Sequence, residues 1–174
     1  MVLNWLVKKG GEHFDAAIAG LVRHTKDFLI GKLTAERLRH EFGVFEQQTS
    51  ASLTVAGRDL ITGVPSQTDV PISLVRAAMK EPLEDCVRAI RSMLDRTPPD
   101  VRREIDVNGI CLTGGMANLK GLSTYLEEST GLPVSTVPEP ELCVVKGLQK
   151  IIQDKAYYRR LTYSMLNEDY RWLR

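Results

Sequence analysis

The sequence has no surplus of charge of either sign and no long hydrophobic run. Its 23 lysine and arginine residues nearly balance 22 aspartate and glutamate residues, which leaves a formal net charge of +1. A dedicated nucleic-acid-binding protein usually carries a basic face or a basic run, so we expect no nucleic-acid partner. No stretch approaches the roughly 20 apolar residues that a membrane-spanning helix needs. The remaining composition is typical of a globular protein.

The first residues lack the pattern of a secretory signal. In MVLNWLVKKGG the positive charge follows the apolar run instead of preceding it, and there is no small-residue cleavage site. The β-branched and aromatic residues of this run predict a buried strand.

Cysteine and histidine are scarce, with three of each. The cysteines (Cys86, Cys111 and Cys143) are odd in number, widely spaced and set among apolar neighbours, which favours reduced core thiols over a disulfide framework. The histidines show no metal-ligand spacing such as HExxH, so we predict no metal site.

Helical patterns dominate the first 43 residues. Phe14, Ile18 and Val22 recur at helical spacing and predict one apolar stripe that faces a core. Thr34 stands where an N-cap is expected, ahead of AERLRHEF, and Gly43 is the expected C-terminal stop.

The middle of the chain changes to strand patterns. TSASLTVAG alternates like a strand, and a second strand is predicted over residues 67–70, after glycine and proline turn signals. Residues 44–80 therefore read as a small α+β insertion. We predict a helix over residues 73–79 that stops before Pro82, and a new amphipathic helix after it.

The last part of the chain alternates strands and helices. VNGICLTGG predicts a strand that ends in a glycine turn, followed by a helix with Leu119, Leu122 and Leu126 on one face. A further strand over residues 133–137 and a helix over residues 141–153 complete an α/β core with an inserted segment. For the aromatic, basic tail we expect docking on the parent domain, with contact to a membrane surface or a partner as the alternative.

Two places could carry a ligand. The turn formed by Thr113, Gly114 and Gly115 would let a backbone approach a phosphate or a base closely, although a diglycine turn is more often a tight connection. Glu36 and Arg39 project from the same side of their helix. They form either a solvated ion pair or a frame for a nucleobase and ribose, with Glu36 accepting from hydroxyls and Arg39 stacking on the base.

The motifs of a self-sufficient enzyme are missing. The sequence contains no GxxxxGK[ST], no complete GxGxxG and no GxSxG, and no nucleophile is spaced to pair with a base. We therefore expect no catalytic residues in this chain.

Five segments in one order resemble the MreB family of bacterial actins. These are GGEHFDAAI, LIGKLTAERLRHEFG, TVAGRDLITGVP, GICLTGGMANLKGL and TGLPVSTVPEPELCVVKG. They are similar to the C-terminal half of that family. The resemblance implies the C-terminal half of the actin-like ATPase fold, which is ribonuclease H-like. A larger subdomain would comprise residues 1–43 and 80–174, and residues 44–79 would form a smaller inserted outer subdomain.

The resemblance also implies a half-site for ATP. By motif position its residues would be Glu36 and Arg39, on the base and ribose, and the glycine-turn residues Gly114, Gly115, Met116 and Ala117. The family commonly has lysine in place of Arg39 and often a third glycine in place of Met116. Its phosphate loops, and with them most Mg²⁺ contacts, lie earlier in the family pattern than the residues present here. Binding by this chain alone should be weak or absent, without hydrolysis.

The implied role is in an actin-like cytoskeletal filament that determines cell shape by organising wall synthesis. The implied partners are further copies, full-length filaments, the inner membrane surface and wall-synthesis proteins, and the implied location is cytoplasmic, at the inner face of the cell membrane. The alternative is a truncated interaction module that caps or regulates full-length filaments.

Overall fold

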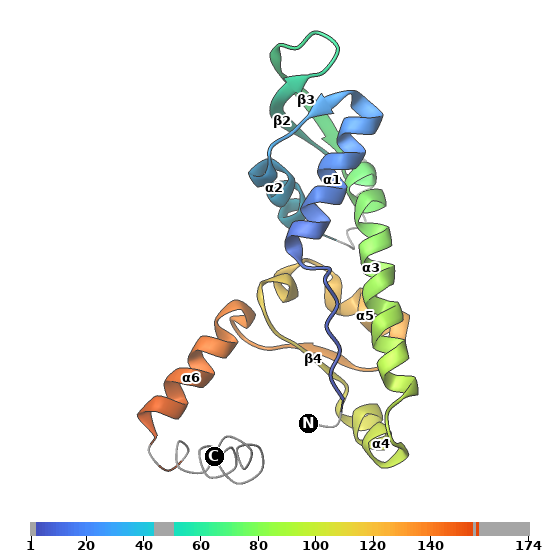
Figure 1. The fold of residues 1–174 in the computed structure, drawn as a ribbon, viewed down its shortest axis with the longest axis vertical. Helices are drawn as coiled ribbons and strands as arrows, with labels where there is room; N and C mark the ends of the chain where they lie inside the picture. Colours follow the sequence, from blue (N-terminus) through green and yellow to red (C-terminus); the bar gives the residue numbers. More distant parts are fainter. Residues whose placement is uncertain (1–2, 44–50, 155, 157–174) are drawn as a thin grey trace, which may run out of the picture.

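The computed structural model describes residues 3–43, 51–154 and residue 156. The molecule is elongated (Figure 1), with the hairpin of β2 (Ser52–Asp59) and β3 (Pro65–Pro71) at one end. Helix α4 (Pro99–Asn108) lies at the opposite end, and α6 (Cys143–Gln153) projects sideways as an arm.

The hairpin forms most of a three-stranded antiparallel sheet. The strand order is β1-β2-β3, with β1 (Phe28–Leu29) paired to the end of β2. The predicted alternation is confirmed in β2, where Val55 is buried between exposed neighbours, and the predicted second strand over residues 67–70 lies within β3, where Val70 is buried. Of these three strands, the sequence did not predict β1, because a strand of two residues is too short to show an alternation of apolar and polar residues.

Helices α1 (Gly11–Lys26) and α2 (Lys32–Phe42) pack against each other and against this sheet. The predicted stripe on α1 is confirmed. The predicted N-cap is wrong, because α2 begins at Lys32 with Gly31 as its cap and Thr34 already lies in the first turn. The backbone N–H of Thr34 donates to the carbonyl of Gly31 at 3.1 Å. Gly43 ends the helix as predicted.

A single helix, α3 (Ile72–Asp95), runs along most of the molecule. The predicted break before Pro82 is therefore wrong, since the proline lies inside the helix and is buried. A proline inside a helix removes one backbone hydrogen bond and its ring clashes with the preceding turn, which together cost about 3 kcal/mol. The helix buries Met79 on one side of the proline and Leu83 on the other, so packing on both sides holds it together.

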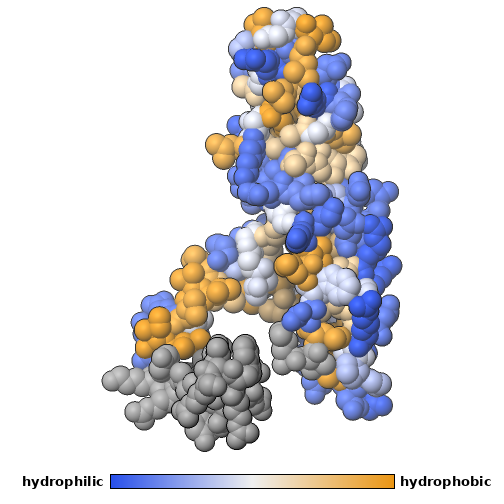
Figure 2. Space-filling model, viewed as in Figure 1, coloured by the Kyte–Doolittle hydropathy of each residue, from blue (hydrophilic) through white to orange (hydrophobic). Residues whose placement is uncertain are grey.

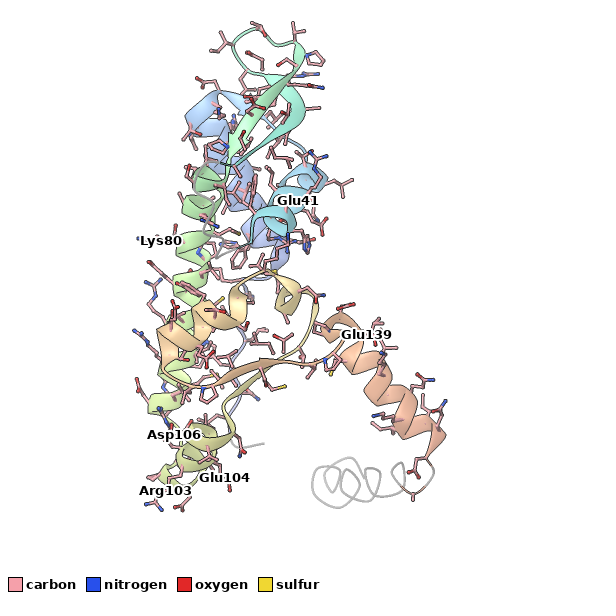
Figure 3. The ribbon with its side chains drawn as sticks, turned by 180° about the vertical axis from the view of Figure 1, so that it is seen from behind. Glu41, Lys80, Arg103, Glu104, Asp106 and Glu139 are labelled. Atoms are coloured by element: carbon pink, nitrogen blue, oxygen red, sulfur yellow. The ribbon has the colours of Figure 1, made fainter. Side chains whose placement is uncertain are left out.

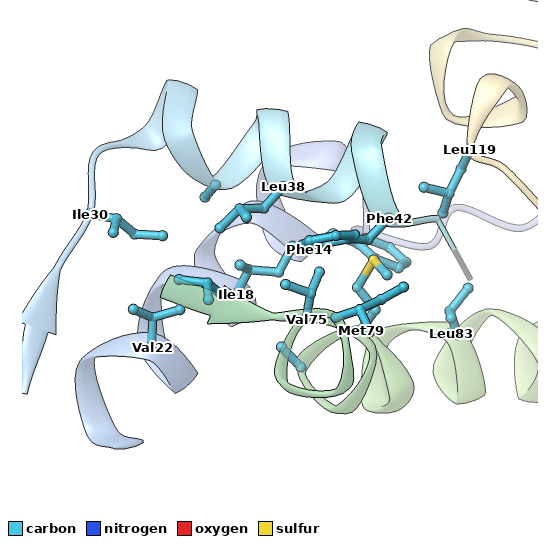
Figure 4. Packing of buried hydrophobic residues seen from close by; sticks show 14 of the residues in the cluster. Phe14, Ile18, Val22, Ile30, Leu38, Phe42, Val75, Met79, Leu83 and Leu119 are labelled. Atoms are coloured by element: carbon cyan, nitrogen blue, oxygen red, sulfur yellow. The ribbon is translucent and has the colours of Figure 1, made fainter. Parts of the chain in front are cut away.

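One continuous core joins these elements. Figure 4 shows Phe14 and Ile18 of α1 facing Leu38 of α2, with Val75 and Met79 of α3 on the other side. All five side chains are nearly inaccessible to solvent. The core extends through Leu119, Leu122 and Leu126, so residues of both predicted subdomains share it. The division at residues 44 and 79 stays a prediction.

A second, smaller sheet lies below. Strand β4 (Ile110–Leu112) pairs in parallel with β5 (Val134–Thr136), and the glycine turn follows β4 as predicted. A 3₁₀ helix, η1 (Gly115–Asn118), intervenes before α5 (Leu122–Thr130). The predicted helix over residues 141–153 is present as the 3₁₀ turn η2 (Pro140–Leu142) and α6.

Residues 3–10 form no regular structure, so the prediction of a buried N-terminal strand is wrong. Leu6 is 82% exposed, and no described strand pairs with this segment. The segment lies along α3, where Lys9 forms an ion pair with Asp85 at 3.1 Å and Arg96 stands 5.0 Å from the ring centre of Trp5. The predicted docking of the tail concerns residues outside the described part. Within the part that is described, no helix is long and apolar enough to cross a membrane.

Candidate functional site

An open pocket of about 660 Å³ lies where α1, α2 and η1 meet. Helices α1 and α2 lie close together in the chain, whereas η1 comes much later, and each of the three contributes one wall. The lining residues are Gly11, Glu12, Asp15, Lys32, Leu33, Glu36, Arg39, His40, Gly115, Met116 and Asn118.

Four of the six predicted site residues line this pocket: Glu36, Arg39, Gly115 and Met116. Gly114 and Ala117 belong to the same turn but are not among the lining residues. The backbone N–H of Gly114 donates to the carbonyl of Pro140 at 2.8 Å. The structure thus brings the helix motif and the glycine turn to one place, while the role of each residue stays a prediction.

Arg39 is not a surface cation. Only 4% of the residue is exposed, and its Nε donates to Oδ1 of Asp15 at 2.7 Å while Nη2 donates to Oδ2 at 3.4 Å. Its Nη1 lies 3.4 Å from the sulfur of Met116. Glu36 is a more distant partner of Arg39: its Oε1 lies 3.7 Å from Nη2 of Arg39, and its side chain is 44% exposed. The solvated ion pair that sequence alone allowed for Glu36 and Arg39 is therefore a minor contact beside the buried pair.

Sequence reasoning missed Asp15. It lies on the buried side of α1, three residues before Ile18 and seven before Val22. A carboxylate at a position of the apolar stripe needs a buried partner, because burying an unpaired charge is costly. That interruption of the stripe was the available signal, and it pointed to a cation elsewhere in the chain.

Glycine serves two purposes here: at position 11 it lets the walls approach each other, and at position 114 it lets the turn form. A Cβ atom at Gly11 would lie 3.3 Å from Nη2 of Arg39 and 3.4 Å from the sulfur of Met116. Gly114 has φ of +86°, which a residue with a side chain rarely adopts. Asn118, the last residue of η1, donates to Oε2 of Glu141 at 2.6 Å and so ties this turn to η2. This bond holds the pKa of Glu141 below its usual range.

The rim of the pocket carries an exposed ion pair. Lys32 donates to Glu12 at 2.6 Å. This hydrogen bond is the main cause of a lowered pKa for Glu12 and a raised pKa for Lys32. Both groups therefore stay charged at neutral pH at the mouth of the pocket.

The donor set fits a nucleoside better than a metal ion. Among the described residues, no group of three or more His, Cys, Asp and Glu side chains could hold a metal ion. The pocket instead offers a half-exposed carboxylate, a fixed guanidinium and a glycine turn. These groups suit the hydroxyls, ring edge and flat face of a nucleoside.

The fold belongs to the actin-like class. MreB5 of Spiroplasma citri bound to AMPPNP matches with a TM-score of 0.82 and 24% sequence identity, covering 91% of this chain and 47% of that chain. The MamK double helical filament matches with a TM-score of 0.70 and 18% identity, over 85% of this chain and 46% of that chain. The predicted fold class, a partial actin-like α/β fold, is confirmed.

The sequence then gives the family. The model of the MreB/Mbl protein family matches residues 1–160. The cell shape-determining protein MreB of Escherichia coli K12 is 37% identical over 154 residues, covering 88% of this chain and 44% of that protein. The cell shape-determining protein Mbl of Bacillus subtilis is 31% identical over 165 residues, covering 93% and 50%. The chain belongs to the MreB/Mbl family and spans about half the length of these relatives, as the sequence motifs predicted.

Proposed function

We propose that this chain supplies one side of the ATP cleft of an MreB-type filament protein. The observation that carries the proposal is the pocket that joins Glu36 and Arg39 of α2 to Gly115 and Met116 of η1. Supporting it, a solved structure with the same fold, MreB5 of Spiroplasma citri, was bound to AMPPNP.

The residues of the pocket suit the nucleoside part of ATP. Glu36 would accept hydrogen bonds from the ribose hydroxyls, and Arg39 would contact the base. The glycine turn would lie against the nucleoside from the other side, where Met116 narrows the space that a third glycine would leave. Bound ATP would supply the reactive phosphoanhydride, and its Mg²⁺ finds no carboxylate cluster among the described residues.

The chain alone should bind ATP weakly and not hydrolyse it. Phosphoryl transfer depends on groups that position and neutralise the phosphates, and the sequence contains no GxxxxGK[ST] loop. Phosphate release from ATP and Mg²⁺ should therefore equal a buffer control. Turnover well above that control would contradict the expectation of half a site.

Titration with a fluorescent ATP analogue, followed by displacement with AMPPNP, tests the binding. We expect saturable binding with a Kd of roughly 0.1 to 1 mM. Glu36→Gln should weaken it severalfold. Glu104→Gln is the matched control, because Figure 3 shows Glu104 on α4, far from α2. Failure of the wild type to bind at millimolar nucleotide, or equal effects of both substitutions, would overturn the proposal.

Filament assembly is the second part of the proposal. MamK is a filament in its solved structure, and this chain shares its fold. We propose that copies of the complete protein associate into filaments at the inner face of the cell membrane and act on wall-synthesis proteins to determine cell shape. Fluorescent fusion of the full-length protein in its own cells tests this location, and a diffuse signal would contradict it.

The exposed face of α6 favours a second candidate, a module that caps or regulates full-length filaments. Figure 2 shows hydrophobic residues gathered along this arm. Its exposed apolar residues are Val144, Val145, Leu148 and Ile152. Added to a polymerising full-length relative, a cap should reduce the pelleted polymer at a substoichiometric ratio. An unchanged pellet at excess would rule out capping.

A further inference from the structure

One edge of the Arg39 guanidinium donates hydrogen bonds to Asp15, whereas its other edge has a weak acceptor. Nε and Nη2 donate to the two oxygens of Asp15, at 2.7 and 3.4 Å. The acceptor that the structure gives Nη1 is the thioether sulfur of Met116, at 3.4 Å. A thioether is a weak acceptor, so this N–H edge keeps most of its capacity to donate. The edge lies in the wall of the pocket, since Arg39 and Met116 both line it.

Burial fixes this orientation. The side chains of Asp15 and Arg39 are each 5% exposed. A two-pronged pair between a carboxylate and a guanidinium sets the plane of the guanidinium, and neither charge can leave its partner without a large desolvation penalty. The guanidinium therefore cannot turn its flat face to follow a ligand while Asp15 holds it. What it can present is the Nη1 edge.

The start of α1 also packs against Arg39 and Met116 and helps to keep the guanidinium in this orientation. A Cβ atom at Gly11 would approach both Nη2 of Arg39 and the sulfur of Met116 within 3.4 Å. Guanidinium, thioether and the first turn of α1 are thus in close contact. The flexible member of this group is Met116, an unbranched side chain on the η1 turn that is partly exposed.

We infer that Asp15 is a positioning residue and that Met116 occupies the donor edge of Arg39 until a ligand replaces it. The inference rests on the proposed function and deepens it. Asp15 aims the Nη1 edge, and an acceptor atom of the nucleoside, a ring nitrogen or a ribose oxygen, takes the place of the sulfur. The Met116 side chain then moves against the nucleoside face. Met116 thus competes with the ligand, whereas Asp15 assists it.

These roles predict opposite changes in affinity. Met116→Leu keeps the apolar volume and removes the acceptor, so the free protein has an unsatisfied Nη1 edge and the fluorescent ATP analogue should bind about threefold to tenfold more tightly. Asp15→Asn should bind more weakly by a similar factor. If Asp15 acts through Arg39, adding Asp15→Asn to Arg39→Met should cause no further loss. Met93→Leu and Asp100→Asn are the matched controls, on α3 and α4.

The outcomes separate this inference from the proposed function. Absence of saturable binding by the wild type would overturn both. Wild-type binding with unchanged or weaker binding by Met116→Leu would overturn the inference alone, because a purely structural methionine gives no gain. If circular dichroism shows that Asp15→Asn does not fold, the test rests on Met116→Leu. This variant should bind the fluorescent ATP analogue more tightly, and the gain in affinity should disappear when Met116→Leu is combined with Arg39→Lys. A gain that persists in the Arg39→Lys background would also overturn the inference.

Discussion

Lys120, at the start of the α5 region, packs directly against Gly43 at the end of α2. A Cβ atom at position 43 would lie 2.6 Å from both the Cβ and the carbonyl oxygen of Lys120. The Lys120 ammonium also donates to the carbonyl of Glu41 at 3.2 Å. The end of α2 is therefore joined to the segment that follows η1, and α2 and η1 are two of the three elements that build the pocket.

Gly43→Ala should destabilise the protein by about 2 to 4 kcal/mol. Gly43 has φ of +60° and ψ of −168°, a backbone conformation that is essentially restricted to glycine, and the new methyl group would also collide with Lys120. Gly20→Ala is the matched control, since Gly20 lies inside α1 with open space around it. It should stabilise the helix by about 0.5 to 1 kcal/mol. Urea unfolding followed by circular dichroism measures both, and equal changes would contradict the prediction.

The contact between Lys9 and Asp85 should make stability fall in acid. Hydrogen bonds from Lys9 and Arg88 hold the pKa of Asp85 below its ordinary value of 3.8. A lowered carboxyl pKa contributes stability that is present above the unfolded-state value and is lost as pH falls through the folded-state value. Wild type should therefore exceed Asp85→Asn in melting temperature at pH 6, and the difference should shrink below about pH 4.

Asp95→Asn, at the end of the same helix, is the control for this titration. Its melting temperature should follow that of the wild type through the same pH range. A gap between wild type and Asp85→Asn that stays constant from pH 6 to pH 3 would contradict an origin in the titration of Asp85.

The three thiols should differ in reactivity. The sequence predicted core thiols, which is wrong for Cys111 because this residue is exposed on β4. Cys86 is partly buried on α3, and burial raises the pKa of its thiol. Since the thiolate is the reactive form, iodoacetamide at pH 7.5 should modify Cys111 first and Cys86 last. Mass spectrometry of timed digests checks the order, and Cys86 labelling at the rate of Cys111 would contradict it.

The sequence could predict those elements whose pattern has local causes. The stripe on α1, the alternation in β2, the strand β3 after its turn signals and the glycine turn after β4 all follow from periodicity and turn chemistry, and each is present. Motif order supplied what periodicity could not, namely that α2 and η1 face one pocket. Local rules place Glu36 on one helix and Gly115 in a turn about eighty residues later. They do not predict that the two residues lie close together in space.

Three of the failures fall where packing or pairing outside the local sequence decides the structure. Pro82 stays inside α3 because Met79 and Leu83 are buried on either side of it. The apolar run of residues 1–7 predicted a strand, yet no described strand pairs with the described part of it, and a strand needs a neighbour for its backbone groups. Asp15 was missed because its partner Arg39 lies 24 residues away. In each case the outcome depends on surroundings that the local sequence does not reveal.

The apolar face of α6 should make this chain self-associate. Among the described residues of this arm, Val145 is 61% and Leu148 is 54% exposed. Contiguous exposed apolar surface on a helix favours association in water, because burying it releases about 25 cal/mol for each Å². Replacing both residues with lysine adds two charges to the face and should shift the protein toward monomer in sedimentation velocity. The wild type should show species of higher mass that grow with concentration.

A matched double substitution separates this face from a general effect of charge. Val107 on α4 is 80% exposed and Leu6 in the N-terminal segment is 82% exposed, so lysine at both positions adds the same charge elsewhere on the surface. This control should associate as the wild type does, because salt at physiological ionic strength largely screens repulsion between exposed charges that are more than about 8 Å apart. If both double variants become monomeric, net charge rather than the α6 face controls association. If the wild type is already monomeric at high concentration, the prediction of self-association through the α6 face is wrong.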